Sequence, residues 1–305
     1  MLQFEKEQSI VSVGEVEIGG QPGELPTVLI GSIFYEGHGI VEDSTRGIFD
    51  RRSAGELIEA QDELSDKTGN PCMVDVVGLT PQSMEKYLDF VLDATDSPVL
   101  IDSSSMETKM AGVRYAKEVG ALERSVYNSI SHHVKDEEVS ALRDVGVKSA
   151  IILALNPVNP LPRGRVEVLM GSERRRGLIK VAEEAGLENL LIDAAVLDVP
   201  SIGLAAESIQ IIKNQLGLPS GGAPLNAVLE WEEVVKLGDK AKNVCSASSA
   251  VILCQSGADF ILYGPIGKAN IVFPAVALAD AIALYRAKWH GVRSRTKDHP
   301  LYKIF

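Results

Sequence analysis

Residues 98–131 read PVLIDSSSMETKMAGVRYAKEVGALERSVYNSIS, and this stretch determines the fold that we expect for the chain. An apolar run ends at Asp102, a segment with apolar side chains at helical spacing follows, and a second apolar run ends near Asn128. Gly120 stands just past the helical segment, where glycine commonly ends a helix. The order of strand, helix and strand is that of a β/α unit with parallel strands.

The same alternation of apolar runs and amphipathic segments recurs along the chain. Near-continuous apolar runs are typical of strands that are buried on both faces. The predicted strands are residues 27–35, 72–77, 98–102, 125–129, 149–155, 189–193, 219–223 and 260–263. The predicted helices between them are residues 53–67, 81–94, 108–119, 136–145, 173–185 and 205–216. Eight strands that alternate with helices predict an α/β fold of the (β/α)₈ TIM-barrel type.

A doubly wound open sheet is the alternative architecture. That fold usually has a glycine-rich turn of the form G-x-G-x-x-G after its first strand, whereas residues 36–39 here read EGHG. We therefore expect one barrel domain over residues 1–305. Within residues 1–26, loose alternation around Gly14 predicts a β-hairpin that closes the floor of the barrel.

The composition excludes several classes of protein. The 305 residues carry a formal net charge of −12, so the surface repels phosphate backbones and nucleic acid is not an expected partner. The three cysteines form no C-x-x-C pair, and an odd number argues against a disulfide framework, which fits the cytoplasm. The N-terminus lacks the apolar core of a signal peptide, and no apolar run approaches the roughly 20 residues that span a bilayer, so membrane insertion is not expected.

Polar side chains stand at the ends of five predicted strands. In a barrel of this kind, binding and catalytic residues lie at the C-terminal ends of the strands. The five ends read LIDSSS, VYNSIS, LALNP, LIDAAV and APLNAV. Their polar residues are Asp102, Asn128, Asn156, Asp193 and Asn226. Each could instead cap the helix that follows it, but five together favour a binding site.

This set of side chains suits a pterin ring. Along one edge, a pterin presents an exocyclic amine, a ring N–H and a carbonyl. An ionised carboxylate accepts two parallel donors, whereas a carboxamide both donates and accepts. Two aspartates and three asparagines therefore match the donors and acceptors of that ring.

The same strand ends lack the groups that several other chemistries need. No lysine stands there to form a Schiff base, and no G-x-S-x-G elbow occurs. His132 and His133 are adjacent and do not have the i, i+4 spacing of a helical metal pair, so no bound metal is expected. The site suits binding and orienting a substrate rather than forming a covalent intermediate.

Two other functions remain open at this point. Glycines in residues 219–222 and 264–268 stand at the seventh and eighth strands, where many barrels bind phosphate, so a phosphosugar isomerase or lyase is one alternative. Against it, the acidic residues leave little positive charge for an anion. The other alternative is a non-catalytic subunit that only binds a pterin within a larger assembly.

The strand ends LIDSSS, VYNSIS, LIDAAV and PLNAV resemble those of methyltetrahydrofolate:corrinoid methyltransferases, which are pterin-binding barrels. Three longer segments are more specific: GGQPGELPTVLIGSIFYEGHGIVED, DKTGNPCMVDVVG and MAGVRYAKEVG. They resemble the H subunit of tetrahydromethanopterin S-methyltransferase and its bacterial relatives in glycine betaine demethylation systems. The resemblance covers nearly the whole chain. It implies a methyltransferase that moves a methyl group between a methyl-corrinoid protein and N5 of a tetrahydropterin, and of the two pterins we expect tetrahydrofolate.

The resemblance also implies a role for each strand-end residue. Asp102 and Asp193 would hold the pyrimidine edge of the pterin, and Asn128 would contact the same ring. Asn226 would reach N5, which makes Asn226 and Asp193 the catalytic candidates. Asn156 matches the pattern by strand position.

Asp75 stands in a VDVVG segment that resembles a second-strand motif of pterin-binding barrels. That motif normally has an asparagine where this chain has Val77. Asp75 is therefore left without an assigned role.

The family's partner proteins carry their corrinoid on a D-x-H-x-x-G motif, which this chain lacks. The cobalt is therefore expected on a separate corrinoid protein that docks on the C-terminal face of the barrel. Residues 36–50 and 157–172 are two long connections that we expect to provide this contact. We also expect the chain to form a homodimer.

Overall fold

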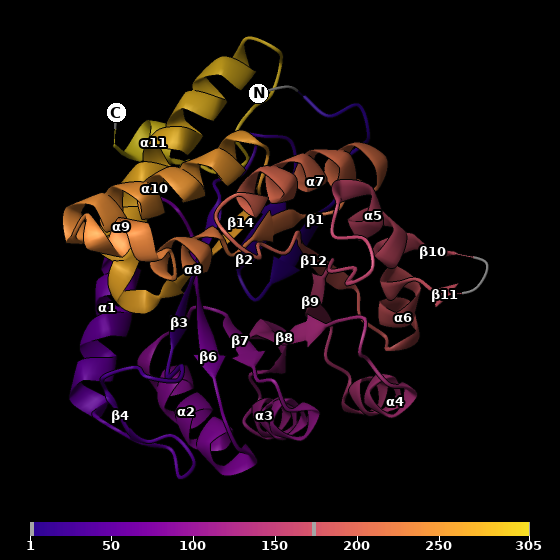
Figure 1. The fold of residues 1–305 in the computed structure, drawn as a ribbon, viewed down its shortest axis with the longest axis vertical. Coiled ribbons are helices and arrows are strands. Elements are labelled where there is room, and N and C mark those ends of the chain that lie inside the picture. The colour runs from indigo at the N-terminus through magenta and orange to yellow at the C-terminus, as the bar shows by residue number, and fades with distance from the viewer. Residues whose placement is uncertain (1–2, 173–174, 305) are drawn as a thin grey trace.

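The computed structural model describes residues 3–172 and 175–304. Its centre is a closed barrel of parallel strands with helices around the outside (Figure 1). The barrel strands are β3 (Val28–Ile33), β6 (Cys72–Val77), β7 (Val99–Asp102), β8 (Ser125–Ile130), β9 (Ser149–Leu153), β12 (Asn189–Asp193), β13 (Ser220–Gly222) and β14 (Phe260–Pro265). Neighbours in the barrel follow this order, and β14 pairs with β3 to close the ring. The predicted eight-stranded TIM barrel is confirmed, and every predicted strand is present.

The helices alternate with the strands as predicted. They are α1 (Arg51–Thr68), α2 (Pro81–Ala94), α3 (Met106–Glu118), α4 (Asp136–Val145), α5 (Pro162–Met170), α6 (Leu178–Glu184), α7 (Ser201–Gln215), α8 (Pro224–Leu229), α9 (Glu232–Lys236), α10 (Asp239–Gln255), α11 (Ala269–Lys288) and α12 (Pro300–Lys303). Local sequence sets several of their ends. Asp50 caps α1 by accepting from two backbone N–H groups, and Gly146 ends α4 with a left-handed φ of 88°.

Two predictions between β9 and α6 are wrong. Residues 157–172 were expected to form a loop, but they contain α5, because Pro162 occupies the first turn of a helix, where its missing N–H costs nothing. The helix predicted for residues 173–185 begins only at Leu178. Before it, β10 (Gly171–Ser172) pairs with β11 (Arg175–Arg176), and residues 173–174 lie outside the described part of the chain.

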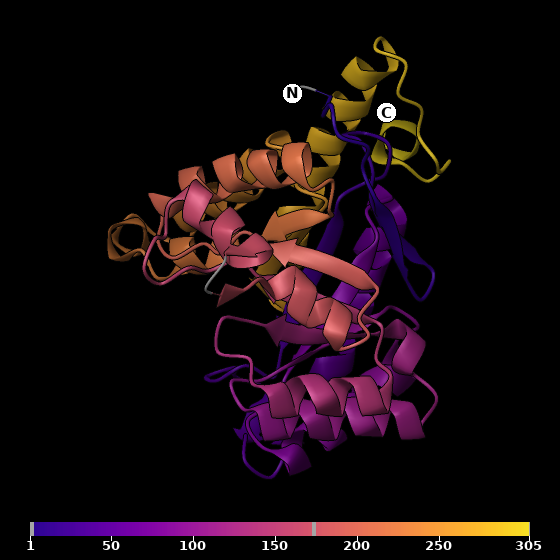
Figure 2. The same ribbon diagram turned by 90° about the vertical axis from the view of Figure 1, so that its right-hand side faces the viewer.

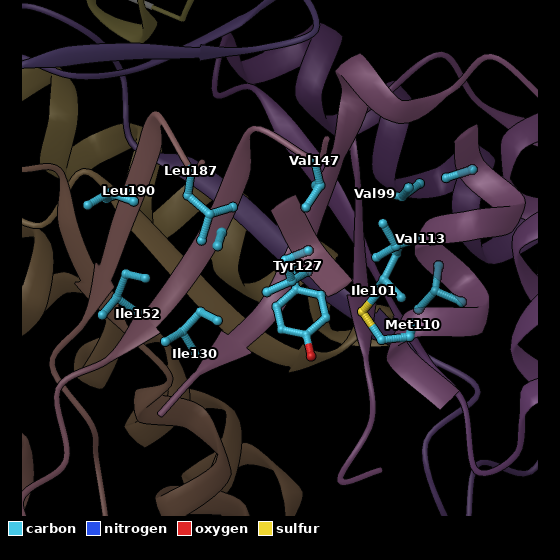
Figure 3. Close-up of a cluster of buried hydrophobic side chains, with 14 of the residues drawn as sticks. Val99, Ile101, Met110, Val113, Tyr127, Ile130, Val147, Ile152, Leu187 and Leu190 are labelled. Carbon is cyan, nitrogen blue, oxygen red and sulfur yellow. The ribbon is translucent and has the colours of Figure 1, made fainter. Parts of the chain in front are cut away.

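Apolar side chains pack on both sides of the barrel wall. Along β7, Val99 and Ile101 point outward and join an outer cluster that includes Met110 and Val113 of α3 (Figure 3). Leu100, between them, belongs to an inner cluster of side chains that fill the barrel. The alternation follows from the two-residue period of a strand, and it determines which residues face the barrel interior.

A hairpin of β1 (Ile10–Val13) and β2 (Val16–Gly19) lies at the N-terminal ends of the barrel strands. Its Val13 and Ile18 are almost completely buried and pack into the inner cluster. The turn at Gly14 donates its N–H to the carbonyl of Glu123, just before β8. The hairpin therefore fills the lower end of the barrel, which leaves the C-terminal end for a ligand.

The helical segment Ile266–Lys288, which includes α11, is long and apolar enough by composition to cross a membrane. This corrects the expectation that no such run exists. However, 56% of its most apolar window is buried within the protein, and Asp280 on it accepts hydrogen bonds from Thr27 and Asn70. The C-terminal end of α11 extends beyond the barrel (Figure 2). These contacts are those of a core helix in a barrel wall.

Candidate functional site

A cavity of about 520 Å³ opens at the C-terminal ends of the barrel strands. Its size is that of a small-molecule site. The lining combines acidic and amide side chains with as many apolar ones. The lining residues are Ser32, Tyr35, Asp75, Val77, Asp102, Asn128, Ser129, Leu153, Asp193, Ala223, Asn226, Leu229, Glu230, Leu262, Gly264 and Pro265.

The strand period places the polar lining residues. Leu100 packs inside the barrel, and Asp102, two residues further along β7, faces the same interior at the open end. The same two-residue spacing holds on three other strands. There the inward-facing Met73, Val126 and Leu191 are followed two residues later by Asp75, Asn128 and Asp193 in the lining. The barrel interior thus changes from apolar to polar within one period, which creates a polar site above an apolar floor.

The structure brings four of the five sequence-predicted site residues into this lining: Asp102, Asn128, Asp193 and Asn226. Asn156 does not line the cavity. Its Oδ1 accepts from the backbone N–H groups of Val158 and Asn159 at 3.1 and 3.2 Å, and its Nδ2 donates to the carbonyl of Gly164 at 3.1 Å. Asn156 therefore holds its own loop together.

Asn226 reaches the cavity from a helix rather than from a strand end. β13 ends at Gly222, and Asn226 lies in the first turn of α8. A Cβ atom on Gly264 would lie 2.5 Å from Asn226 Oδ1, and Gly264 has a φ of 70°. The absent side chain at Gly264 thus makes room for the Asn226 amide, so the two residues form one part of the site.

Asp75, which the sequence analysis left without a role, lies at the centre of the polar cluster. Its side chain is 3% exposed and accepts from Ser32 Oγ at 2.7 Å and from Asn128 Nδ2 at 3.3 Å. Its inward position could have been predicted from the sequence, because Asp75 follows the inward-facing Met73 by two residues. The other polar lining residues follow inward-facing residues on their strands at the same spacing.

Asp75 and Asp102 lie on the neighbouring strands β6 and β7, and the charge of Asp75 acts on Asp102. Burial raises the pKa of Asp75 to about 6. Burial, followed by the charge of Asp75, raises the pKa of Asp102 well above its usual value. The donors Ser32 and Asn128 stabilise the ionised form of Asp75, whereas the charge of Asp75 disfavours the ionised form of Asp102. A proton on this pair is therefore held preferentially by Asp102, which can then donate while Asp75 accepts.

A buried cation lies behind Asp102. Lys109 of α3 is 8% exposed and donates to the carbonyl of Ser129 at 2.9 Å. Its Nζ also lies 3.6 Å from Glu138 Oε1 and 4.4 Å from the centre of the Tyr127 ring. The charge of Lys109 lowers the pKa of Asp102 and so opposes the effect of Asp75. No feature of the strand pattern marked this lysine, because it comes from the outer helix.

Asp193 has a second buried cation behind it. Burial raises the pKa of Asp193 to about 6, while the N–H of Ala195, at 2.8 Å, and the charge of Arg165 lower it. Arg165 of α5 is fully buried and donates to the backbone carbonyls of Pro160 and Ala194. The guanidinium therefore keeps Asp193 mostly ionised at neutral pH. Arg165 was not predicted, since its segment was expected to be a loop.

The lining of this cavity contains no lysine or arginine among the described residues. Lys268, in the glycine-containing segment after β14, donates to Asn243 Oδ1 at 3.2 Å instead. A phosphorylated sugar would therefore meet carboxylates rather than cations. The geometry argues against the phosphosugar alternative.

Comparison with known sequences identifies the family. The family model described as tetrahydromethanopterin S-methyltransferase MtrH subunit matches residues 6–294. The chain belongs to the MtrH family. The H subunit of tetrahydromethanopterin S-methyltransferase from Methanopyrus kandleri is 40% identical over 314 residues, which cover 97% of each chain. The corresponding protein of Methanothermobacter marburgensis is 39% identical over the full length of both chains. The chain is thus an MtrH-family methyltransferase subunit, as the sequence motifs indicated.

Comparison with solved structures confirms the barrel fold. The dihydropteroate synthase of Yersinia pestis has a TM-score of 0.62 at 12% identity and covers 90% of this MtrH-family chain and 98% of its own. The enzyme from Xanthomonas albilineans, solved with 4-aminobenzoic acid, has a TM-score of 0.60 at 15% identity over 91% of this chain and 98% of its own. At such low identity the likeness shows the fold alone.

Proposed function

We propose that this chain transfers a methyl group between N5 of a tetrahydropterin and a corrinoid carried by a separate protein. The observation that carries the proposal is the cavity itself, where Asp75, Asp102, Asn128, Asp193 and Asn226 converge above an apolar floor. The lining holds acceptors and amides but no thiol or basic side chain among the described residues. Such a site orients a neutral ring, and the electron pair for the new bond comes from a substrate rather than from the protein.

The two ionisable parts of the site suit the donors and acceptors along the pyrimidine edge of a pterin. Ionised Asp193 accepts from the exocyclic amine and the adjacent ring N–H. The raised pKa of Asp102 favours its protonated form, which can donate to a ring nitrogen, while Asn128 and Asp75 fix its surroundings. Asn226 approaches the ring from α8 and contacts N5.

The transfer needs control of one lone pair. When the methyl leaves N5, the N–C bond electrons stay on nitrogen, and cobalt supplies the electron pair for the new bond. In the reverse direction, the N5 lone pair attacks the methyl group and the Co–C electrons return to cobalt. The Asn226 amide can donate to N5 or accept from a proton on it by rotating, so it serves both directions.

The direct test is a methyl-transfer assay with the purified chain, a methylated corrinoid protein and each pterin. Tetrahydrofolate, the acceptor expected from the sequence, stays a prediction, whereas the relatives are named for tetrahydromethanopterin. We expect saturable transfer to at least one of the two. Binding of a pterin without any transfer would instead support the non-catalytic subunit.

The corrinoid protein is proposed to dock over the open end of the barrel. The connection after β3 contains a short hairpin of β4 (Val41–Asp43) and β5 (Ile48–Phe49), and Glu42 on it is exposed. Asp43 is less free, because its Oδ1 accepts from the N–H groups of Thr45 and Arg46.

Reversing the charge at Glu42 with lysine is therefore expected to raise the KM for the corrinoid protein severalfold at low salt and to leave pterin affinity unchanged. Steady-state kinetics at two ionic strengths measures this effect. An equal loss of pterin affinity would show that the connection belongs to the pterin site instead.

The expected homodimer and the cytoplasmic location stay predictions. Support for a shared surface comes from an uncharged stripe along α11 and its C-cap residue, where Leu278, Ile282, Tyr285 and Trp289 are 48–79% exposed. Two copies of an acidic chain can bring such stripes together without placing like charges next to each other. Light scattering would report the mass of the resulting dimer.

A further inference from the structure

A second cavity of about 360 Å³ adjoins the first at α8. Its lining is mostly apolar and includes one aromatic ring. The lining residues are Leu197, Asp198, Val199, Pro200, Ala227, Glu230 and Trp231. Glu230 lines both cavities, and Ala227 follows Asn226 directly in the chain. The two cavities therefore meet along one short helix.

We propose that this second cavity binds the aryl arm of the tetrahydropterin. The inference rests on the proposed function, in which Asn226 contacts N5. The arm of a reduced pterin leaves from C6, the ring atom bonded to N5, so a ring with N5 at Asn226 directs its arm toward α8. The second cavity, which shares Glu230 with the first, lies next to α8 in that direction.

The chemistry of the lining fits an arylamine. Trp231 is 39% exposed and Leu197 is 53% exposed, so both present apolar surface that a bound aromatic ring would cover. Aromatic pairs contribute beyond the area that they bury. The arm carries an N–H between the pterin and its aryl ring, and the Glu230 carboxylate, at the junction of the two cavities, is an acceptor for it.

The second cavity is built by two segments that are distant in sequence. The connection after β12 provides residues 197–200, where Ser201 Oγ accepts from the N–H groups of Leu197 and Asp198 at 2.8 and 2.9 Å. Asp198 Oδ1 accepts from the N–H of Ser201 at 2.9 Å, which completes a rigid turn. Trp231 stands between α8 and α9. The cavity thus lies between a hydrogen-bonded turn and the end of a helix.

The test compares a pterin that has the arm with one that lacks it. Calorimetry would measure the Kd of tetrahydrofolate, of tetrahydromethanopterin and of 6-methyltetrahydropterin, which carries only a methyl group at C6. The wild-type protein should bind one of the two arm-bearing pterins more tightly than 6-methyltetrahydropterin. Trp231→Ala should weaken that arm-bearing pterin roughly tenfold and change the Kd of 6-methyltetrahydropterin less than twofold.

Two variants serve as controls. Trp231→Phe keeps an aromatic ring and should retain most of the affinity for the arm. Leu237→Ala removes a side chain that is 73% exposed just beyond α9 and lines neither cavity, so it should change no Kd. If Trp231→Ala weakened both pterins equally or neither, the arm would not occupy this cavity, although the pterin site would stand. If no pterin bound at all, the proposed function would fail together with this inference.

Discussion

Replacing Asn226 by alanine is expected to slow methyl transfer by roughly a hundredfold or more, with pterin affinity within a few-fold of the wild-type value. The reason is that the amide contacts N5, where charge changes during the transfer, whereas the carboxylates hold the rest of the ring. Single-turnover kinetics with methylated corrinoid protein separates this step from binding. A wild-type rate in the Asn226→Ala variant would rule out any part for Asn226 in the transfer.

Two further substitutions test how Asn226 acts. Asn226→Asp keeps the shape of the side chain, but its carboxylate only accepts hydrogen bonds. It should therefore stabilise protonated N5 and change the rates of methyl transfer in the two directions unequally. Gly264→Ala leaves Asn226 intact but places a Cβ 2.5 Å from its Oδ1 at a φ of 70°, and it should reproduce much of the Asn226→Ala defect. Gly267→Ala is the matched control, because a Cβ there meets only an ordinary contact at 3.7 Å.

Replacing Asp193 by asparagine is expected to weaken pterin binding by roughly 10- to 100-fold. A carboxylate that accepts two donors becomes a carboxamide whose N–H₂ faces one of those donors, and losing a charged hydrogen bond costs about 1.5–3 kcal/mol. Calorimetry with the preferred pterin measures the change directly. Affinity unchanged within twofold would show that Asp193 does not hold the pyrimidine edge.

The pH dependence provides an independent check of the same role. Burial raises the pKa of Asp193 to about 6, and the ionised form is the one that accepts two donors. Pterin affinity should therefore be greatest above pH 7 and decrease as the pH falls through 6. In Asp193→Asn the decrease should become shallower but persist, because the pKa of Asp75 is also raised to about 6.

The sequence predicted the barrel because the signals for it are local. A buried parallel strand needs a short apolar run, and a helix on the barrel wall needs an amphipathic segment, so each unit can be recognised within about 30 residues. Where a local signal was ambiguous, the prediction failed. Three prolines in residues 157–162 indicated a loop, yet Pro162 begins α5 and brings Arg165 behind Asp193.

The sequence by itself determined the eight strands and their order along the chain, because each buried strand is a short apolar run. It also placed Asp102, Asn128 and Asp193 at strand ends, where the two-residue period of a strand turns them inward. Only the tertiary structure decided which polar groups meet. It placed Asn226 against Gly264, 38 positions further along, and turned Asn156 toward its own loop. It also placed the Lys109 ammonium of an outer helix beside Asp102. Such contacts join segments that are distant in sequence and come together only when the barrel closes. A pattern within one segment therefore cannot predict them.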